Sequence, residues 1–260
     1  MTSGSAVPQL TILVPTRNEA ENVEPLLKRL SASVEPASVV LFVDDSDDET
    51  PQVIQAARAR GFGSLDIRLL HRSVGQRNGG LGGAVLAGLE QTSTQWVCVM
   101  DGDLQHPPEV VPRLLDAARI DHADLMVASR YVRGGRNEGL GAVRTAVSWA
   151  STVLAKAIFP HRLRGIRDPM SGFFLFRREA LTEPMTPRGF KVLLEIAVRH
   201  PDLVRGEVPF VFVERSMGVS KGTLREGFRY LRLLAEMRWS LRRQPVRAAQ
   251  QGEPETEMAA

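Results

Sequence analysis

The stretch that decides the fold is Val97-Cys98-Val99-Met100-Asp101-Gly102-Asp103-Leu104-Gln105-His106. Four apolar residues are followed at once by two carboxylates, an amide and an imidazole. Residues 96–100 are typical of a short, fully buried strand. Pro107-Pro108 ends it, because proline suits a first helical turn and not a continuing central strand. The carboxylates therefore lie at the C-terminal end of a central strand, the end that opens into the ligand crevice of an α/β sheet.

Asp101 and Asp103 allow more than one interpretation. Their spacing is compatible with a simple polar turn. A calcium loop fits poorly, because its sixth and twelfth positions would be His106 and Pro112, where Gly and Glu are needed. The remaining interpretation is a divalent cation held by one or two carboxylates together with phosphate oxygens of a ligand. The rest of the chain has to decide between the turn and the cation site.

Composition indicates a globular protein that works in a reducing compartment. With 260 residues, 43% of them hydrophobic, the chain can bury the core of one large domain or of one domain with an appendage. The single cysteine, Cys98, lies inside the apolar strand and cannot form an internal disulfide. We expect no export signal and no membrane span, since the first residues lack a basic region and an apolar core and no run of 18 apolar residues occurs.

The net charge of +3 hides a sharp partition along the chain. Residues 1–129 carry 10 basic and 17 acidic side chains, whereas residues 130–178 carry 10 basic and 2 acidic ones. Residues 199–249 are also basic, with 11 basic and 5 acidic side chains. The pattern is that of an acidic half able to hold a cation, followed by a segment able to hold anions. Arginines that only decorate a solvated face would give the same count.

Strands and helices alternate through the first half of the chain. Strands are predicted at 10–14, 39–43, 65–70, 96–100 and 124–128, with helical stretches between them. This alternation predicts a doubly wound sheet. The first turn carries no G-x-G-x-x-G, so the dinucleotide-binding fingerprint is absent. Asn18 is the expected N-cap of the first helix.

Two loops at the predicted ligand edge carry further candidate groups. Asp44 and Asp45 follow the second strand, where a carboxylate can accept hydrogen bonds from a ribose hydroxyl or a base amino group. The glycine-rich segment 79–83 leads into a helix and is compatible with a phosphate-binding loop. Tight backbone packing explains those glycines equally well.

The second half of the chain predicts two amphipathic helices. In the helix at 142–159, Arg144, Ser148 and Thr152 form a polar stripe beside a broader apolar face. That face suits either a buried core helix or a helix in a membrane interface. The basic amphipathic helix at 221–243 indicates an anionic membrane surface or a partner helix. Glu195, alone in an apolar segment, requires a basic partner.

Six motifs in order resemble the family 2 glycosyltransferases with a GT-A fold, and among these the polyprenol-phosphate sugar synthases of the dolichol-phosphate mannose synthase group. They are V-P-T-R-N-E-A-E-N at 14–22, V-D-D at 43–45, M-D-G-D-L-Q-H-P-P-E at 100–109, S-R-Y at 129–131, D-P-M-S-G-F at 168–173 and E-R-S-M-G-V-S-K at 214–221. The motif at 100–109 is the most specific. The motif after the second strand is one residue shorter than the family's usual form, so nothing past Asp45 transfers safely.

The resemblance implies a role for each matching residue. Around the donor nucleotide sugar it places Pro15, Arg17, Glu19, Asp44 and Asp101. It implies that Asp103 and Gln105 ligate Mg²⁺ or Mn²⁺. Around the reacting phosphates and the acceptor phosphate it places Arg130, Arg144, Ser148, Arg215 and Lys221. Asp101, Asp103 and Arg130 would be the catalytic set.

The resemblance also implies a domain organisation. It predicts a GT-A catalytic domain at 9–221, with a mixed, mostly parallel sheet flanked by helices. The segment 142–159 would be one membrane-interface helix and 222–243 a second. Residues 1–8 are expected to be a flexible N-terminus and 244–260 a disordered tail. Many relatives continue into transmembrane helices, and this chain does not, so we expect peripheral binding at the cytoplasmic face of a membrane.

The expected reaction is inverting transfer of a hexosyl group to a polyprenyl monophosphate. By family analogy the donor is GDP-mannose; UDP-glucose and UDP-N-acetylglucosamine are the alternatives. A lipid monophosphate, with a second pKa near 6, is largely ionised at neutral pH and needs no general base. It needs positive charge, and arginine offers the planar fork that phosphate prefers.

Other function classes are disfavoured for specific reasons. A transferase acting on a soluble hydroxyl acceptor needs a general base, and Asp168 is the nearest candidate. A non-catalytic sugar-nucleotide-binding module would not need the intact metal motif. Nucleic-acid binding is not expected, because aromatic residues are only 6% of the chain and none interleave with the arginine runs. No stable protein partner is predicted.

Overall fold

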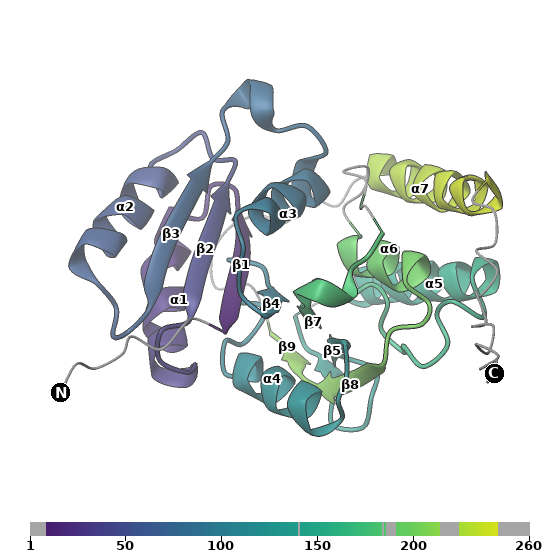
Figure 1. Ribbon diagram of the computed structural model, residues 1–260. Coiled ribbons are helices and arrows are strands. Elements are labelled where there is room, and N and C mark those ends of the chain that lie inside the picture. Colours follow the sequence, from purple (N-terminus) through teal and green to yellow (C-terminus); the bar gives the residue numbers. More distant parts are fainter. Residues whose placement is uncertain (1–8, 140, 184, 186–190, 214–223, 244–260) are drawn as a thin grey trace, which may run out of the picture.

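The fold is built on one mixed sheet. The computed structural model describes residues 9–139, 141–183, 185, 191–213 and 224–243. Within them, a sheet of seven strands has the order β3-β2-β1-β4-β7-β5-β8 (Figure 1). Its strands are β1 (Leu10–Thr16), β2 (Val39–Asp44), β3 (Asp66–His71), β4 (Trp96–Val99), β5 (Leu125–Ser129), β7 (Phe174–Arg177) and β8 (Arg205–Pro209). All neighbouring pairs are parallel except those of β7, which runs antiparallel between β4 and β5. The predicted mixed, mostly parallel sheet is confirmed.

Helices cover both faces of the sheet. One core packs α1 (Ala20–Ser33), α2 (Thr50–Arg60) and α4 (Val110–Ile120) against the strands. The other core lies under α3 (Gly80–Glu90), α5 (Ala142–Ile158), α6 (Val192–Arg199) and α7 (Leu224–Arg243). A sheet covered on both faces explains why its strands are near-continuous apolar runs.

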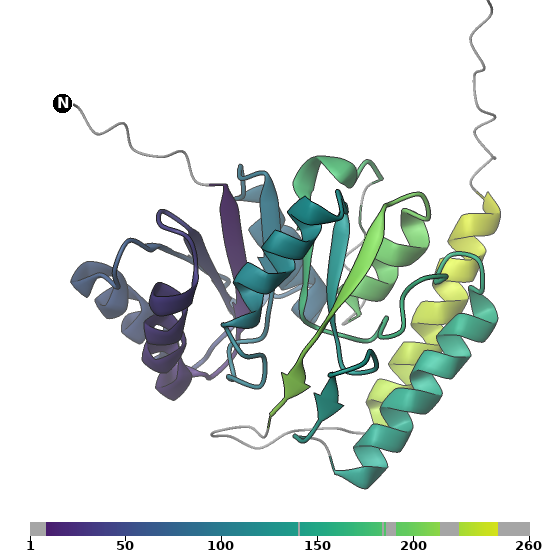
Figure 2. The ribbon, with the colours of Figure 1, turned by 90° about the horizontal axis from the view of Figure 1, so that it is seen from below.

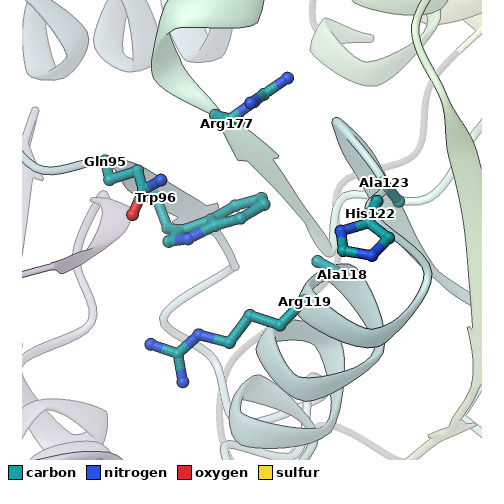
Figure 3. A pocket seen from close by; sticks show the side chains of 7 residues that line it. All are labelled: Gln95, Trp96, Ala118, Arg119, His122, Ala123 and Arg177. Carbon is teal, nitrogen blue, oxygen red and sulfur yellow. The ribbon is translucent and has the colours of Figure 1, made fainter.

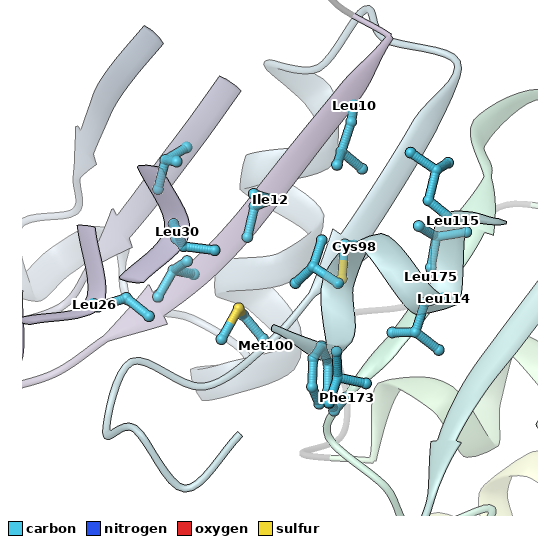
Figure 4. Packing of buried hydrophobic residues seen from close by; sticks show 14 of the residues in the cluster. Leu10, Ile12, Leu26, Leu30, Cys98, Met100, Leu114, Leu115, Phe173 and Leu175 are labelled. Carbon is cyan, nitrogen blue, oxygen red and sulfur yellow. The ribbon is translucent and has the colours of Figure 1, made fainter. Parts of the chain in front are cut away.

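The strand that precedes the carboxylates lies in the middle of this core. Cys98 is fully buried beside Ile12, Met100 and Leu175 in the cluster that also takes in Leu114 (Figure 4). Burial raises the pKa of the Cys98 thiol well above its ordinary value, so this cysteine is an inert core residue. The residues after Val99 are thereby carried to the edge of the sheet on a rigid support.

Two boundaries differ from the sequence-based expectation. Asn18 is not the N-cap of α1: its φ of 58° places it one residue outside, and Glu19 is the cap. The apolar run at 208–213 predicts one last strand, but the structure divides it in two, because β8 ends at Pro209, which has no N–H to continue a ladder. The chain then enters β9 (Val211–Phe212), which pairs with β6 (Arg136–Asn137) in a separate two-stranded sheet.

α5 and α7 lie side by side at one end of the molecule (Figure 2). The Tyr230 hydroxyl donates to the Ser151 carbonyl at 2.6 Å, and Arg238 Nη1 donates to the Ile158 carbonyl at 2.9 Å, so the helices run parallel. Leu234 packs into the core. Large apolar side chains on the outer surface of the pair are exposed and are called here the α5/α7 apolar face: Val147, Trp149, Val153, Leu154, Phe228, Leu231 and Trp239.

Exposure of this face argues against α5 as a simple core helix, one of the two possibilities left by its sequence. None of the described helices is both long and apolar enough to cross a membrane.

Candidate active site

The loops that follow β1 and β2 are tied to each other by hydrogen bonds. The Asn18 amide donates to Ser46 Oγ at 2.8 Å, and the Asp47 amide donates to Asn18 Oδ1 at 3.0 Å. The Glu19 amide donates to Thr50 Oγ1 at 3.0 Å. Side-chain bonds of this kind between adjacent loops fix the shape of the sheet edge before any ligand binds.

Asp44, which is predicted to bind the donor nucleotide sugar, is fully buried at this edge. Its carboxylate accepts hydrogen bonds from Thr16 Oγ1 at 3.0 Å and Ser46 Oγ at 2.5 Å, and it lies 2.7 Å from His71 Nδ1. The carboxylate thus joins the ends of three neighbouring strands. Its position at the ligand edge agrees with the expectation, but its hydrogen bonds in this structure are internal.

The donor-binding residues predicted from the first motif lie at the end of β1 and just after it. Pro15 is half-buried in the strand itself. Arg17 extends into solvent, with its guanidinium 3.9 Å from the Asp47 carboxylate. Glu19 accepts a hydrogen bond from Asn22 Nδ2 at 2.6 Å. These residues line the same edge as Asp44.

The glycine-rich segment packs tightly against the backbone. Arg72 pairs with Asp45 through two bonds of 2.7 and 2.6 Å, and its Nη2 also donates to the Gly80 carbonyl at 3.1 Å. A Cβ on Gly83 would lie 1.9 Å from the Asn78 carbonyl oxygen. Glycine is therefore required there by packing alone, whatever else the loop does.

The D-G-D turn places its two carboxylates differently. The side chain of Asp101 is 42% exposed, whereas Asp103 is buried, with Oδ1 accepting from the Gln105 amide at 3.1 Å. A Cβ on Gly102 would lie 3.0 Å from Thr16 Cγ2 and 3.3 Å from Val14 Cγ1, so these side chains of β1 would have to shift to admit one. Leu104 has a φ of 64°, which is rare for a branched side chain and is held here by burial of that side chain. The five residues thus form a polar turn that also presents carboxylate and amide oxygens, the groups that a hard cation prefers.

Gln105 is held in a way that suits a metal ligand. Its Nε2 donates to the Val213 carbonyl at 3.0 Å, which leaves the amide oxygen as the group available to a cation. Together with the carboxylate of Asp103 it makes an all-oxygen ligand set, the kind that Mg²⁺ and Mn²⁺ prefer. Among the described residues, no cluster of three His, Cys, Asp or Glu side chains is arranged to hold a metal by itself. The donor set fits a cation that completes its shell with ligand phosphates and water.

His106 has a structural role, and its contacts could not be read from the sequence. Its Nδ1 accepts the Asp101 amide at 3.0 Å, and its ring stacks on Phe173 with the ring centroids 5.1 Å apart. Burial lowers the pKa of His106 to about 4 and outweighs the nearby carboxylate of Asp103. The neutral ring therefore anchors the first carboxylate of the turn. The signal available in the sequence was only its position three residues after Asp103.

Arg130 and Asp168 form a buried pair on the neighbouring rim. Asp168 is fully buried and accepts three hydrogen bonds from Arg130: from the backbone N at 3.1 Å, and from Nε and Nη2 at 2.8 Å each. Burial disfavours the charge of Arg130, but the hydrogen bonds and charge of Asp168 outweigh it and raise the pKa of the guanidinium. The guanidinium lies over the rings of Tyr131 and Phe212, 5.4 and 5.7 Å from their centroids.

Residues 11–183 match the family model described as glycosyl transferase family 2. The chain belongs to this family.

Named relatives cover most of the chain. It is 34% identical over 235 residues to a dolichol-phosphate mannosyltransferase of Pyrococcus furiosus, covering 89% of this chain and 64% of that protein. It is also 34% identical to the dolichol-phosphate mannosyltransferase of Saccharomyces cerevisiae, covering 88% of this chain and 86% of the relative. An undecaprenyl-phosphate mannosyltransferase of Micrococcus luteus is 34% identical over 221 residues, and the match covers 80% of this chain and 85% of that protein. The chain thus spans less than two thirds of the Pyrococcus protein.

Solved structures support the fold independently. The Mycobacterium tuberculosis glucosyl-3-phosphoglycerate synthase, solved in complex with Mn²⁺, UDP-glucose and phosphoglyceric acid, superposes with a TM-score of 0.65. It is 19% identical, and the match covers 90% of this chain and 80% of that one. The GT-A fold expected from the sequence is confirmed.

The acceptor residues expected for this family 2 transferase are described only in part. Ser148 lies on α5, where its Oγ is 3.4 Å from the hydroxyl of Tyr131, the residue after Arg130. Arg144 is also on α5, but its side chain lies outside the described residues. Arg215 and Lys221 lie outside them altogether. The structure thus brings Ser148 to the same rim as Arg130, through a tyrosine that was not a predicted site residue.

One described cavity lies away from this rim. It measures about 270 Å³ and is lined by residues at the start of β4 and the end of α4 and β7, among them Trp96, Arg119 and Arg177 (Figure 3). Arg119 and Arg177 are each paired with a carboxylate, of Glu35 and Asp124 respectively. Since β4 begins at this end, the cavity is at the edge of the sheet opposite the D-G-D turn.

Proposed function

We propose that the chain transfers a mannosyl group from GDP-mannose to a polyprenyl monophosphate at a membrane surface, with Mg²⁺ or Mn²⁺ as cofactor. The similarity to three polyprenyl-phosphate mannosyltransferases over most of the chain carries this proposal. The neighbour solved with Mn²⁺ and a nucleotide sugar supports the need for a divalent metal. UDP-linked glucose or N-acetylglucosamine is the alternative donor.

The state of Asp168 favours a phosphate acceptor over a soluble hydroxyl acceptor. A hydroxyl nucleophile needs a general base within reach of its proton. Asp168 was the nearest candidate, yet it is fully buried and both of its oxygens accept hydrogen bonds from Arg130. A monophosphate nucleophile, already ionised at neutral pH, has no such requirement.

The roles of the site residues follow from their chemistry. Asp103 and Gln105 would hold the metal, and Asp101 would lie beside the donor ribose or phosphates. When bound there, the cation would stabilise the charge of the leaving nucleoside diphosphate. Arg130 and Ser148, with Arg144, Arg215 and Lys221, would orient the acceptor phosphate for attack opposite the leaving group. Configuration at the sugar would be inverted.

The α5/α7 apolar face would bring this site to its lipid. Exposed Trp149 and Trp239 are of the type enriched at membrane–water interfaces. Exposed Arg229 on α7 would favour anionic headgroups, whereas Arg232 is already paired with Glu236 at 2.7 Å. We propose peripheral binding at the cytoplasmic face.

Product formation from two alternative sugar nucleotides, compared side by side, tests the function. The protein is incubated with Mn²⁺, undecaprenyl phosphate and either radiolabelled GDP-mannose or UDP-glucose, and lipid-linked label is counted. Label from GDP-mannose is the expected result. Label from UDP-glucose alone would replace mannose in the proposal, and no lipid-linked label from any sugar nucleotide would contradict it.

Two variants test the metal site within the same assay. Asp103→Ala should abolish metal-dependent turnover while the chain remains folded, whereas Asp116→Ala, an exposed acid on α4, should not change it. Full activity of Asp103→Ala would rule out the metal role. Arg144→Ala should raise the KM for the lipid phosphate far more than the KM for the donor.

A further inference from the structure

The function proposed above assigns Asp168 no role, because its hydrogen bonds to Arg130 prevent it from acting as a general base. It is nevertheless a fully buried carboxylate at the rim of the site. Its own amide donates to Glu207 Oε1 at 3.0 Å, which ties the turn it begins to β8. A buried carboxylate must be neutralised by a positive charge. Among the described residues, Arg130 is the charged side chain that donates hydrogen bonds to Asp168.

The pairing uses Arg130 in a particular way. Asp168 takes up the Nε–Nη2 edge of the guanidinium and also the backbone N of the same residue. Tyr131 and Phe212 lie against the guanidinium, and the Arg130 side chain is only 8% exposed. A planar group held at one edge and by two rings cannot rotate, so the remaining nitrogen, Nη1, has a fixed direction.

Charge gives a second consequence of the same pairing. The Asp168–Arg130 pair is neutral as a unit, so Arg130 offers a phosphate less net attraction than a free arginine. What it offers is one directed N–H donor group. Such a donor contributes to rate by orientation more than by affinity.

We propose that Asp168 is a positioning residue that orients Arg130 toward the reacting phosphates. The inference rests on the proposed function, in which Arg130 contacts those phosphates. Asp168 itself does not touch substrate. The two residues are 38 positions apart, and the D-P-M-S-G-F turn holds the carboxylate where β5 delivers the arginine.

A double-mutant cycle on turnover tests this role. Asp168→Asn keeps the shape of the side chain but loses the second carboxylate oxygen and the charge. We expect kcat with GDP-mannose and undecaprenyl phosphate to fall by about 100-fold, the scale of a misplaced catalytic group, with the KM for the donor nearly unchanged. Arg130→Met should give a similar loss. The double variant should be no slower than Arg130→Met alone, because Asp168 acts only through Arg130.

A matched variant separates positioning from folding. Ser171 lies in the same turn, and its hydroxyl donates to the Ala128 carbonyl at 2.8 Å without contact to Arg130. Ser171→Ala should keep the wild-type kcat. That result would show that a perturbed turn is not enough to slow turnover and that the loss in Asp168→Asn comes from its contact with Arg130. If Asp168→Asn does not fold, Arg130→Lys is measured on its own. It keeps the charge of Arg130 but lacks the planar fork that Asp168 holds, so kcat at the wild-type level in that variant would overturn the proposal.

Two failures can be told apart. Additive losses in the double variant, or a rise in KM with unchanged kcat, would overturn the positioning role while leaving the function intact. A wild-type protein that forms no lipid-linked mannose would overturn the proposed function itself.

Discussion

Protonation of His106 should make the protein measurably less stable in mild acid. The ring is buried, and its pKa is lowered from 6.5 to about 4. In the unfolded chain the same imidazole titrates near its ordinary value. Between these two values the unfolded state binds a proton that the folded state does not, so stability is lost as the pH falls from about 6.5 toward about 4.

The size of the effect follows from the two pKa values. Going from pH 7.5 to pH 5.0, this one group removes about 2 kcal/mol from the free energy of unfolding, and the loss approaches about 3 kcal/mol by pH 4. The acceptor at Nδ1 is the atom that binds the Asp101 amide. Protonation therefore opposes both the burial of the ring and the hydrogen bond that anchors the turn.

Urea unfolding in the presence of EDTA provides the measurement. The comparison protein is His106→Asn, which keeps an acceptor near the Nδ1 position and does not titrate. Both proteins share every other acid and histidine, so the difference between their pH dependences isolates His106. Wild type should lose about 2 kcal/mol more than the variant between pH 7.5 and 5.0. Equal losses would refute the account of a neutral, buried anchor.

Three further substitutions test other parts of the structure. Gly102→Ala should lower the free energy of unfolding by about 1–3 kcal/mol through contact with β1, whereas Gly75→Ala, in open space, should change it by less than about 0.5 kcal/mol in urea unfolding. Tyr230→Phe should cost about 1 kcal/mol in the same assay, since it removes the bond between α7 and α5. Trp149→Ser should weaken flotation with anionic vesicles about tenfold, and Ile120→Ser, exposed on α4, should leave it unchanged; equal effects would rule out the α5/α7 apolar face.

The order of strands and helices could be predicted because it is encoded locally. The strand at 96–100 and the polar residues after it follow from an apolar run and a turn signal alone. The place of β7 could not be predicted. Phe174–Arg177 is an apolar run like the others, and nothing in such a run says that it inserts antiparallel between β4 and β5.

The candidate site was predictable to the extent that its groups lie on strand ends. Asp44 was expected at the end of the second strand and lies there, as the last residue of β2. Its burial depends on which face that residue takes, and one residue of register decides that. The Asp168–Arg130 pair joins two turns far apart in the chain, so neither residue reveals the other in sequence. The partner required for Glu195 was only four residues away: Arg199 Nε donates to it at 2.8 Å.

The antiparallel β7 has a consequence for how the segment between β5 and β7 can change in evolution. β5 ends and β7 begins side by side, with Val127 opposite Phe174, so residues 130–173 leave the sheet and return to it at one place. That excursion contains Arg130, α5 and Asp168. An insert whose two ends are adjacent can be lengthened, shortened or exchanged without altering the strands that support the rest of the site. Under the proposed function, the part that would bind the acceptor can therefore change while the part that would bind the sugar nucleotide stays the same.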